Sequence, residues 1–311
     1  MINRIRLAEA AELATTSPKT KRRRRGLAPS TCKKYVVAQN RLIEMFGPER
    51  DVTTITPGEL WDWSESLTMK YPNPITANSY RRDVRAMWNH LKKAGVAVCS
   101  TDDAFEMEKT TKRIKAISDV NYWRIMAGGG LQDTAMAAIL AQSGMRRDAL
   151  RGMLKSKTEF WQYSDGLAMA TVVQEKGGKY EIKFGLNLAA SLLNIWLDVR
   201  GQFLAALGVA DHDHIWIATD SGGPMSYGNI QAVFDRLKKR GHVPTHEPAN
   251  PHSFRHHFAQ KRAIAGMPLP VLSSMLGHAQ ISTTEIYLNI EEDRIRDAFF
   301  AKVHQPDYNL P

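Results

Sequence analysis

The sequence is poor in cysteine and contains no long hydrophobic run. Cysteine occurs only at Cys32 and Cys99, which excludes a disulfide framework and a C-x-x-C metal pair. The longest purely apolar run covers residues 135–141, whereas a membrane-spanning helix needs about 20 predominantly apolar residues. The N-terminus also lacks the apolar core of a secretory signal. These absences predict a cytoplasmic protein without a membrane partner.

Acidic residues are outnumbered by basic ones. Lys and Arg total 42 and Asp and Glu total 32, so the net charge is +10. The hydrophobic fraction of 43% is that of a globular protein and excludes a wholly disordered chain. A length of 311 residues predicts two domains. The excess of positive charge indicates a polyanionic partner, most simply nucleic acid.

The strongest concentration of charge lies near the N-terminus. Residues 19–25 read Lys-Thr-Lys-Arg-Arg-Arg-Arg, and such a block repels itself, so we predict a flexible basic tail over residues 1–28. The block can contact phosphates or enter a minor groove. The alternative is a solvated tail with non-specific affinity only. The DNA contacts predicted here are Lys21, Arg22, Arg23, Arg24 and Arg25.

Helical periodicity predicts an all-helical domain over residues 29–103. Its helices are expected to begin at Ser30, Thr56 and Thr76, and the third is expected to end at Gly95. One side of the third helix carries basic side chains and the other side carries apolar ones. We therefore predict DNA contacts from three of its residues, namely Arg81, Arg82 and Arg85.

The remainder of the chain is predicted to form a second, mixed α+β domain. A polar linker is expected over residues 104–116, a mostly helical domain over 117–290 and a tail over 291–311. Two β-prone runs, 167–173 and 180–184, flank a Gly-Gly turn and predict an antiparallel hairpin. The fold class expected for the whole chain is mainly α, with one small antiparallel sheet.

Five local signals in the second half are weak individually but occur in an informative order. They are Gly144-Met145-Arg146, Lys176 at the hairpin turn, the H-x-x-R of His252 and Arg255, Leu276-Gly277-His278, and Ser282-Thr283-Thr284-Glu285-Ile286-Tyr287. In this order and spacing they resemble the tyrosine recombinase family, which includes the phage integrases. The resemblance covers roughly residues 30–305 and is strongest over residues 251–290.

The resemblance implies a catalytic role for six residues and a double-stranded DNA recombination site as partner. The six are Arg146, Lys176, His252, Arg255, His278 and Tyr287 as the nucleophile. It implies no cofactor and no metal, a dimer on one site and a tetramer when two sites are paired. The N-terminal helical domain resembles the SAM-like core-binding domain of that family. A need for accessory DNA-bending proteins stays open.

The chemistry of DNA strand exchange explains why these residue types occur together. Negative charge grows on the non-bridging oxygens of the attacked phosphate, and Arg146 and Arg255 can hold these oxygens with permanently charged forks. A tyrosine hydroxyl has an ordinary pKa near 10 and needs a base, for which His252 is suited. Lys176 can protonate the leaving 5′-oxygen, and His278 can donate to a non-bridging oxygen.

Three features depart from the family pattern or compete with it. The family carries an acidic residue three positions after its first arginine, where this chain has Ala149. Asp148 lies one position earlier, about 100° away around a helix. Lys179 is a second candidate for the hairpin lysine. The run Asp-His-Asp-His at 211–214 has metal-ligand residue types, but it precedes an apolar run and we predict no metal there.

Two other functions are compatible with parts of this pattern. A type IB topoisomerase shares the chemistry but relaxes DNA without pairing sites, and a recombinase-like regulator binds DNA without cutting it. The leading prediction is a site-specific recombinase that works through a 3′-phosphotyrosine and a Holliday junction, in a bacterial or phage context. The tail over residues 291–311 is expected either to dock on a neighbouring protomer or to pack on its own domain.

Overall fold

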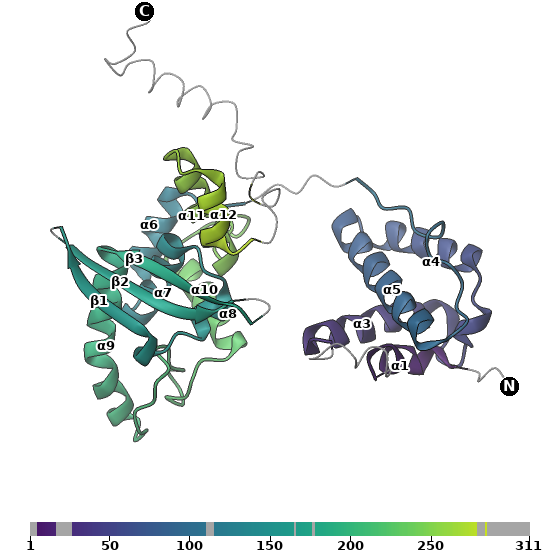
Figure 1. Cartoon of the computed structure of the whole chain (residues 1–311), viewed down its shortest axis with the longest axis horizontal. Coiled ribbons are helices and arrows are strands. Elements are labelled where there is room, and N and C mark those ends of the chain that lie inside the picture. Colours follow the sequence, from purple (N-terminus) through teal and green to yellow (C-terminus); the bar gives the residue numbers. More distant parts are fainter. Residues whose placement is uncertain are drawn as a thin grey trace, which may run out of the picture. The chain divides into compact units, whose positions relative to one another are not determined.

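The computed structural model describes residues 5–16, 27–109, 115–164, 166–175, 178–278 and 284. The chain divides into two compact units, Met1–Lys112 and Arg113–Pro311, which we call the N-terminal and the C-terminal unit (Figure 1). Within the described residues, no helix is long and apolar enough to cross a membrane.

The regular elements of the N-terminal unit are all helices among its described residues. Its elements are η1 (Leu7–Glu9), α1 (Ala10–Thr16), α3 (Pro29–Phe46), η2 (Val52–Thr54), α4 (Pro57–Lys70) and α5 (Pro74–Ala94). Thr56 caps α4 in a reciprocal arrangement with Glu59, and α5 ends at Gly95 with φ of 95°. Both of these boundaries were predicted. The helix starts predicted at Ser30 and Thr76 are wrong, because a proline takes the first helical position in α3 and α5.

The core of the N-terminal unit extends beyond its predicted limits at both ends. Leu7 and three small residues of α1, Ala10, Ala11 and Ala14, are buried in it. Gln39 fixes this segment, since its side chain accepts from Ala11 N (2.6 Å) and donates to Ala8 O (3.0 Å). The prediction of a flexible tail is therefore wrong for residues 5–16. The basic block over residues 19–25 lies outside the described residues.

At the other end, the predicted linker is partly structured. Ala104 and Phe105 are buried in the core of the N-terminal unit. Two carbonyls of this segment, those of Thr101 and Phe105, accept hydrogen bonds from Arg85 (3.3 and 3.2 Å). Arg85 is thus only partly exposed and holds the segment after α5 in place. Because the side chain is partly exposed, its contact with DNA stays a prediction beside this internal role.

Arg81 is buried, although it lies on the side of the helix predicted to be basic. Its side chain is 1% exposed. It donates to the hydroxyl of Ser64 (2.7 Å), to the Ser64 carbonyl (2.8 Å) and to Asn78 Oδ1 (3.1 Å), and it pairs with Glu108 at 3.5 Å. The prediction for Arg81 is wrong because this guanidinium joins α5 to α4. Arg82 is exposed, and its contact with DNA stays a prediction.

The C-terminal unit combines a small sheet with helices. Its strands β1 (Thr158–Tyr163), β2 (Gly166–Gln174) and β3 (Tyr180–Leu186) form an antiparallel sheet in the order β1-β2-β3. Val172 pairs with Ile182 and Ala170 with Phe184, so the predicted hairpin is confirmed. Strand β1 was not predicted as a separate element. The helices are α6 (Asp119–Gly128), α7 (Leu131–Ser143), α8 (Arg147–Arg151), α9 (Leu188–Ala206), α10 (Tyr227–Arg240), α11 (Pro251–Ile264) and α12 (Leu269–Leu276), with the short η3 (Lys155–Lys157).

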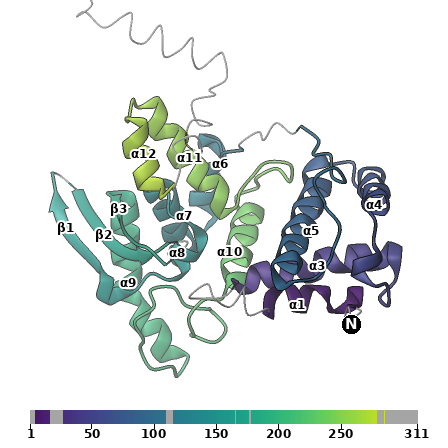
Figure 2. The same ribbon diagram turned by 45° about the vertical axis from the view of Figure 1, so that its right-hand side comes forward.

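Helix α7 is the central element of this unit. Ten of its residues are buried, and it packs against α9, α11 and β3. Figure 2 shows the sheet on one side of α7 and helices α10 and α11 on the other. A helix that is apolar on all sides is typical of such a buried position. The end of α7, the start of α11 and the end of α12 come together, and the four predicted catalytic residues that the structure describes lie at or near these ends, namely Arg146, His252, Arg255 and His278.

The contrast between Arg81 and Arg82 gives a test of the N-terminal unit. Replacing Arg81 by Met leaves buried acceptors without a donor, so we expect the free energy of unfolding of this unit to fall by about 2–4 kcal/mol. The control Arg82→Met removes an exposed charge and is expected to change it by about 0.5 kcal/mol or less. Urea denaturation of the two variants measures both. Equal stability of the two would contradict the assignment of Arg81 as a buried structural residue.

Candidate active site

Three cationic side chains converge on the C-terminal end of α12. The last carbonyls of a helix lack intrahelical partners and carry partial negative charge, so they attract cations. Here three consecutive carbonyls each accept from a different element. The carbonyl of Met275 accepts from Lys183 of β3, and the carbonyl of Leu276 accepts from Arg255 of α11. The carbonyl of Gly277 accepts from Arg146, which precedes α8 (3.1 Å). His278 follows directly. The helix end thus gathers two of the predicted catalytic arginines and places a predicted catalytic histidine beside them.

A tight turn at the end of α7 positions Arg146. Gly144 has φ of 61°, and a Cβ there would lie 2.3 Å from Phe258 Cδ1, so only glycine fits. The Gly144 carbonyl accepts from Arg255 Nη1 (2.6 Å), and the Arg255 side chain is buried. Arg255 therefore fixes both the turn that leads to Arg146 and the end of α12.

Arg146 has an acidic partner that the sequence analysis missed. Glu175, at the end of the β2 segment, accepts from Arg146 Nη1 at 2.6 Å, and its side chain is 1% exposed. Burial by itself would raise the pKa of Glu175, but hydrogen bonding from Arg146 and the charge of Lys183 outweigh it and lower the pKa. Asp148 instead has a side chain that is 68% exposed and lies 3.7 Å from Arg151. The only available signal for Glu175 was its position directly before Lys176.

His278 is held by a hydrogen bond of 2.8 Å between its Nδ1 and Thr284 Oγ1. The pKa of His278 is lowered to about 4 by burial of the ring and by the positive charges of Arg255 and Arg146. The ring is therefore neutral at pH 7 and carries one N–H. When the Thr284 hydroxyl donates to Nδ1, the ring proton is on Nε2, and the ring acts as a donor through that nitrogen. Such a donor fits the predicted contact with a non-bridging phosphate oxygen.

His252 lies at the start of α11, in the first turn of the helix. Asn250 caps this helix by accepting from the backbone N–H groups of His252 (3.0 Å) and Ser253 (3.1 Å). The His252 ring is exposed and lies 4.2 Å, centre to centre, from the ring of His256 one turn later. Burial of the ring, together with electrostatic interactions with its neighbours His252 and Arg255, lowers the pKa of His256 to about 4. His256 is thus a neutral neighbour for His252 at pH 7.

A pocket of about 400 Å³ lies between α8, α10 and the start of α11. Its lining residues are Arg146, Arg147, Asp148, Gln231, Asn250, Pro251, His252 and Arg255. Arg147 lies over the ring of Tyr227, with 3.3 Å from Cζ to the ring centre. Three arginines and one aspartate line this pocket, so its net positive charge suits an anion such as a phosphodiester. Arg147 and Gln231 were not predicted as site residues.

The structure therefore brings together four of the six predicted catalytic residues. Arg146, His252 and Arg255 line one pocket, and His278 follows the carbonyl that Arg146 contacts. The other two, Lys176 and Tyr287, lie outside the described residues. The alternative lysine, Lys179, is exposed.

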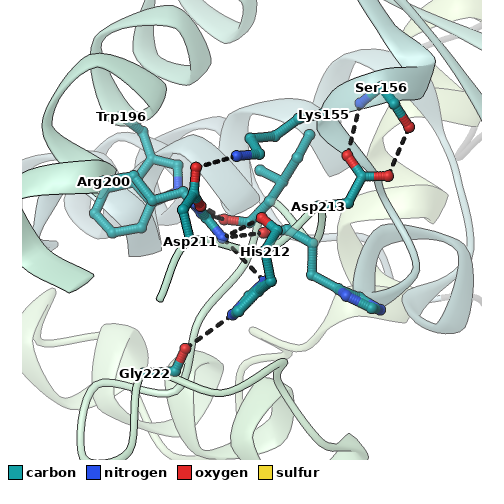
Figure 3. Close-up of polar contacts among 10 residues, drawn as sticks. Lys155, Ser156, Trp196, Arg200, Asp211, His212, Asp213 and Gly222 are labelled. Atoms are coloured by element: carbon teal, nitrogen blue, oxygen red, sulfur yellow. Dashed lines mark hydrogen bonds and ion pairs between the residues drawn. The ribbon is translucent and has the colours of Figure 1, made fainter. Parts of the chain in front are cut away.

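The Asp-His-Asp-His run at 211–214 forms an internal network, shown in Figure 3. Asp211 accepts from Lys155 and from the buried Arg200, and Arg200 also contacts the His212 ring at Nδ1 (3.0 Å). Asp213 accepts from the backbone and the hydroxyl of Ser156 (2.9 and 2.6 Å). The described residues hold no group of three His, Cys, Asp or Glu placed for a metal ion. These side chains anchor the segment after α9.

Comparison with known proteins identifies relatives of this chain. The model of the phage integrase family matches residues 110–294, more than half of the chain. Tyrosine recombinase XerD of Halalkalibacterium halodurans is 29% identical over 203 residues, which are 62% of this chain and 64% of that protein. Tyrosine recombinase XerC of Bacillus subtilis is 24% identical over 252 residues, 77% of this chain and 79% of that protein. The chain thus spans less than two thirds of the length of the XerD relative.

Solved structures show the same fold. A XerH site-specific recombinase bound to a palindromic difH substrate has a TM-score of 0.70 at 16% identity, covering 93% of this chain and 84% of that chain. A lambda integrase dimer bound to a core site has a TM-score of 0.67 at 16% identity, covering 92% and 77%. The fold predicted from the sequence, mainly helical with a small antiparallel sheet, is confirmed. The chain belongs to the phage integrase family, that is, to the tyrosine recombinases.

The low pKa of His278 predicts how the C-terminal unit responds to acid. Between pH 6.5 and about 4 the unfolded chain binds a proton at His278 that the folded chain does not. The free energy of unfolding must therefore fall as the pH falls through this range. In His278→Gln this contribution is absent. We therefore expect the free energy of unfolding of this variant to fall less steeply in acid, by up to about 1.4 kcal/mol per pH unit.

Urea unfolding at pH 5, 6 and 7 measures this difference. Hydrogen exchange of the backbone amides of α11 and α12 is the probe. His246→Gln serves as the control, because the His246 side chain is 79% exposed. The assignment is wrong if His278→Gln keeps the pH slope of the unaltered chain.

Proposed function

We propose that this chain is a site-specific DNA recombinase that cleaves and rejoins DNA through a 3′-phosphotyrosine. The observation that carries the proposal is the convergence of Arg146 and Arg255 on the end of α12, beside a pocket that His252 also lines. Family membership and the recombinase relatives support it.

The two arginines supply electrostatic stabilisation of the reacting phosphate. Their guanidinium groups are held by backbone carbonyls before substrate arrives, so little reorganisation is needed when charge develops on the non-bridging oxygens. Guanidinium is permanently charged and matches two phosphate oxygens at once. His278, neutral at pH 7, adds one hydrogen bond to the same charge.

The remaining steps move protons and exchange one ester for another. His252 takes the proton of the Tyr287 hydroxyl, and the phenolate oxygen attacks phosphorus. The bond between phosphorus and the 5′-oxygen breaks, and Lys176 protonates that oxygen. A 5′-hydroxyl of a second strand then reverses the sequence and releases Tyr287. Since the phosphotyrosine retains the ester bond, rejoining requires no ATP, and exchange of two strands gives a Holliday junction.

The partner we propose is a double-stranded DNA recombination site, bound by a dimer and paired in a tetramer. Support comes from the lambda integrase structure, which is a dimer on a core site. We propose that Arg82 and the basic residues 21–25 contact the DNA backbone, and that residues 291–311 dock on a neighbouring protomer. Accessory DNA-bending proteins would act at the same sites.

Covalent trapping tests the proposed chemistry. Purified protein is incubated with nicked suicide duplexes tiled across the DNA that flanks its gene, and a denaturing gel reveals a protein–DNA adduct. We expect an adduct in the unaltered chain and none in Tyr287→Phe, because only the nucleophilic oxygen is removed. Binding of the cognate duplex in a gel-shift assay is expected to be unchanged.

The outcomes separate the candidate functions. Sequence-specific binding without any adduct favours a DNA-binding regulator, whereas relaxation of any supercoiled plasmid favours a topoisomerase. An adduct that persists in Tyr287→Phe means that another residue is the nucleophile.

A second test addresses the basic block. Replacing residues 21–25 by Gln leaves the structured segment 5–16 in place, unlike deletion of the whole N-terminus. Each phosphate contact that is lost is expected to reduce the log–log salt dependence of binding by about 0.9. Affinity measured between 50 and 200 mM salt gives the slope, and an unchanged slope means that the block does not touch DNA.

A further inference from the structure

We propose that Glu175 is the positioning residue for Arg146, and that it joins this arginine to the hairpin that carries Lys176. The inference rests on the proposed recombinase function and adds to it a residue outside the six that the resemblance implied. Glu175 takes the place of the acid that the family carries three positions after its first arginine, where this chain has Ala149.

The first step is the geometry around Arg146. One carboxylate oxygen of Glu175 accepts from Arg146 Nη1 (2.6 Å) and the other accepts from the Arg146 backbone N–H (3.3 Å). Together the two contacts fix the backbone of Arg146 and its guanidinium group. Arg146 Nη2 donates to Gly277 O at the same time. The orientation of the guanidinium is thus set before a phosphate binds, which is the preorganisation that transition-state stabilisation needs.

The second step is that, among the residues that the structure describes, Glu175 is the acid within ion-pair distance of Arg146, whereas Asp148 only lines the same pocket. Ala149 is buried and apolar, and the Asp148 side chain is mostly exposed and near Arg151. Glu175, in contrast, is almost fully buried, and a buried carboxylate is stable only beside cations or donors. Arg146 and Lys183, whose Nζ lies 3.8 Å from the carboxylate, provide them. Arg146 therefore stabilises the buried charge of Glu175, and Glu175 in turn orients Arg146.

The third step is the connection to the hairpin. The backbone N–H of Glu175 donates to the carbonyl of Lys179 (2.8 Å), and its carbonyl accepts from the N–H of Gly178 (3.1 Å). Glu175 therefore belongs to the described base of the hairpin, and its carboxylate ties Arg146 to that base. Lys176 follows Glu175 in the sequence.

The test is Glu175→Gln, which keeps the shape of the side chain and removes its charge. Glu181→Gln is the matched control, since Glu181 pairs with the same Lys183 at 2.7 Å. With the trapped suicide duplex, we expect the single-turnover cleavage rate of Glu175→Gln to fall about 10- to 100-fold. Its affinity for the duplex should stay within about twofold, because a misplaced cation still attracts phosphate. Glu181→Gln should cleave at the unaltered rate.

A split between cleavage and binding distinguishes positioning from a structural role, since a poorly folded variant loses both. If Glu175→Gln does not fold, Glu175→Asp replaces it, because the shorter side chain keeps the charge but withdraws from Arg146. The same slow cleavage with unchanged affinity is then expected. An unaltered cleavage rate in the folded variant overturns the inference, and so do equal losses in Glu175→Gln and Glu181→Gln. Absence of an adduct in the unaltered chain instead overturns the proposed function.

Discussion

The C-terminal end of α12 is the element on which the active-site geometry depends. Lys183, Arg255 and Arg146 come from three separate parts of the C-terminal unit, and each donates to one of three consecutive carbonyls. Positive charges repel one another, so a concentrated source of negative potential is required to bring these three side chains together. The helix end supplies it with backbone atoms, and Glu175 supplies the remaining charge.

Local chemistry allowed much of the fold to be predicted from the sequence. Thr56 before proline and Gly95 specify helix boundaries through short-range interactions, and these predictions were correct. The two β-prone runs pair as the predicted antiparallel hairpin. The order and spacing of Arg146, Arg255 and His278 placed the site for a different reason, namely similarity to a known family. Both kinds of signal can be recognised because each boundary and each motif occupies only a few consecutive residues.

The errors arose where a charged side chain has a distant partner. Arg81 lies among basic neighbours in the sequence, yet its donors are used by Ser64 and Asn78 inside the unit. Glu175 was overlooked because its partner Arg146 is 29 positions away. Net charge identified a class of ligand for the chain, but tertiary contacts decide which cations remain for that ligand.

The hydrogen bond between His278 and Thr284 has a consequence for the histidine itself. Thr284 is fully buried, so bulk water does not replace its hydroxyl beside Nδ1. Valine has nearly the shape of threonine but no hydroxyl. Exchanging one hydroxyl for a methyl group at this position would therefore leave the packing almost as it is and remove the contact that favours the Nε2 tautomer of His278.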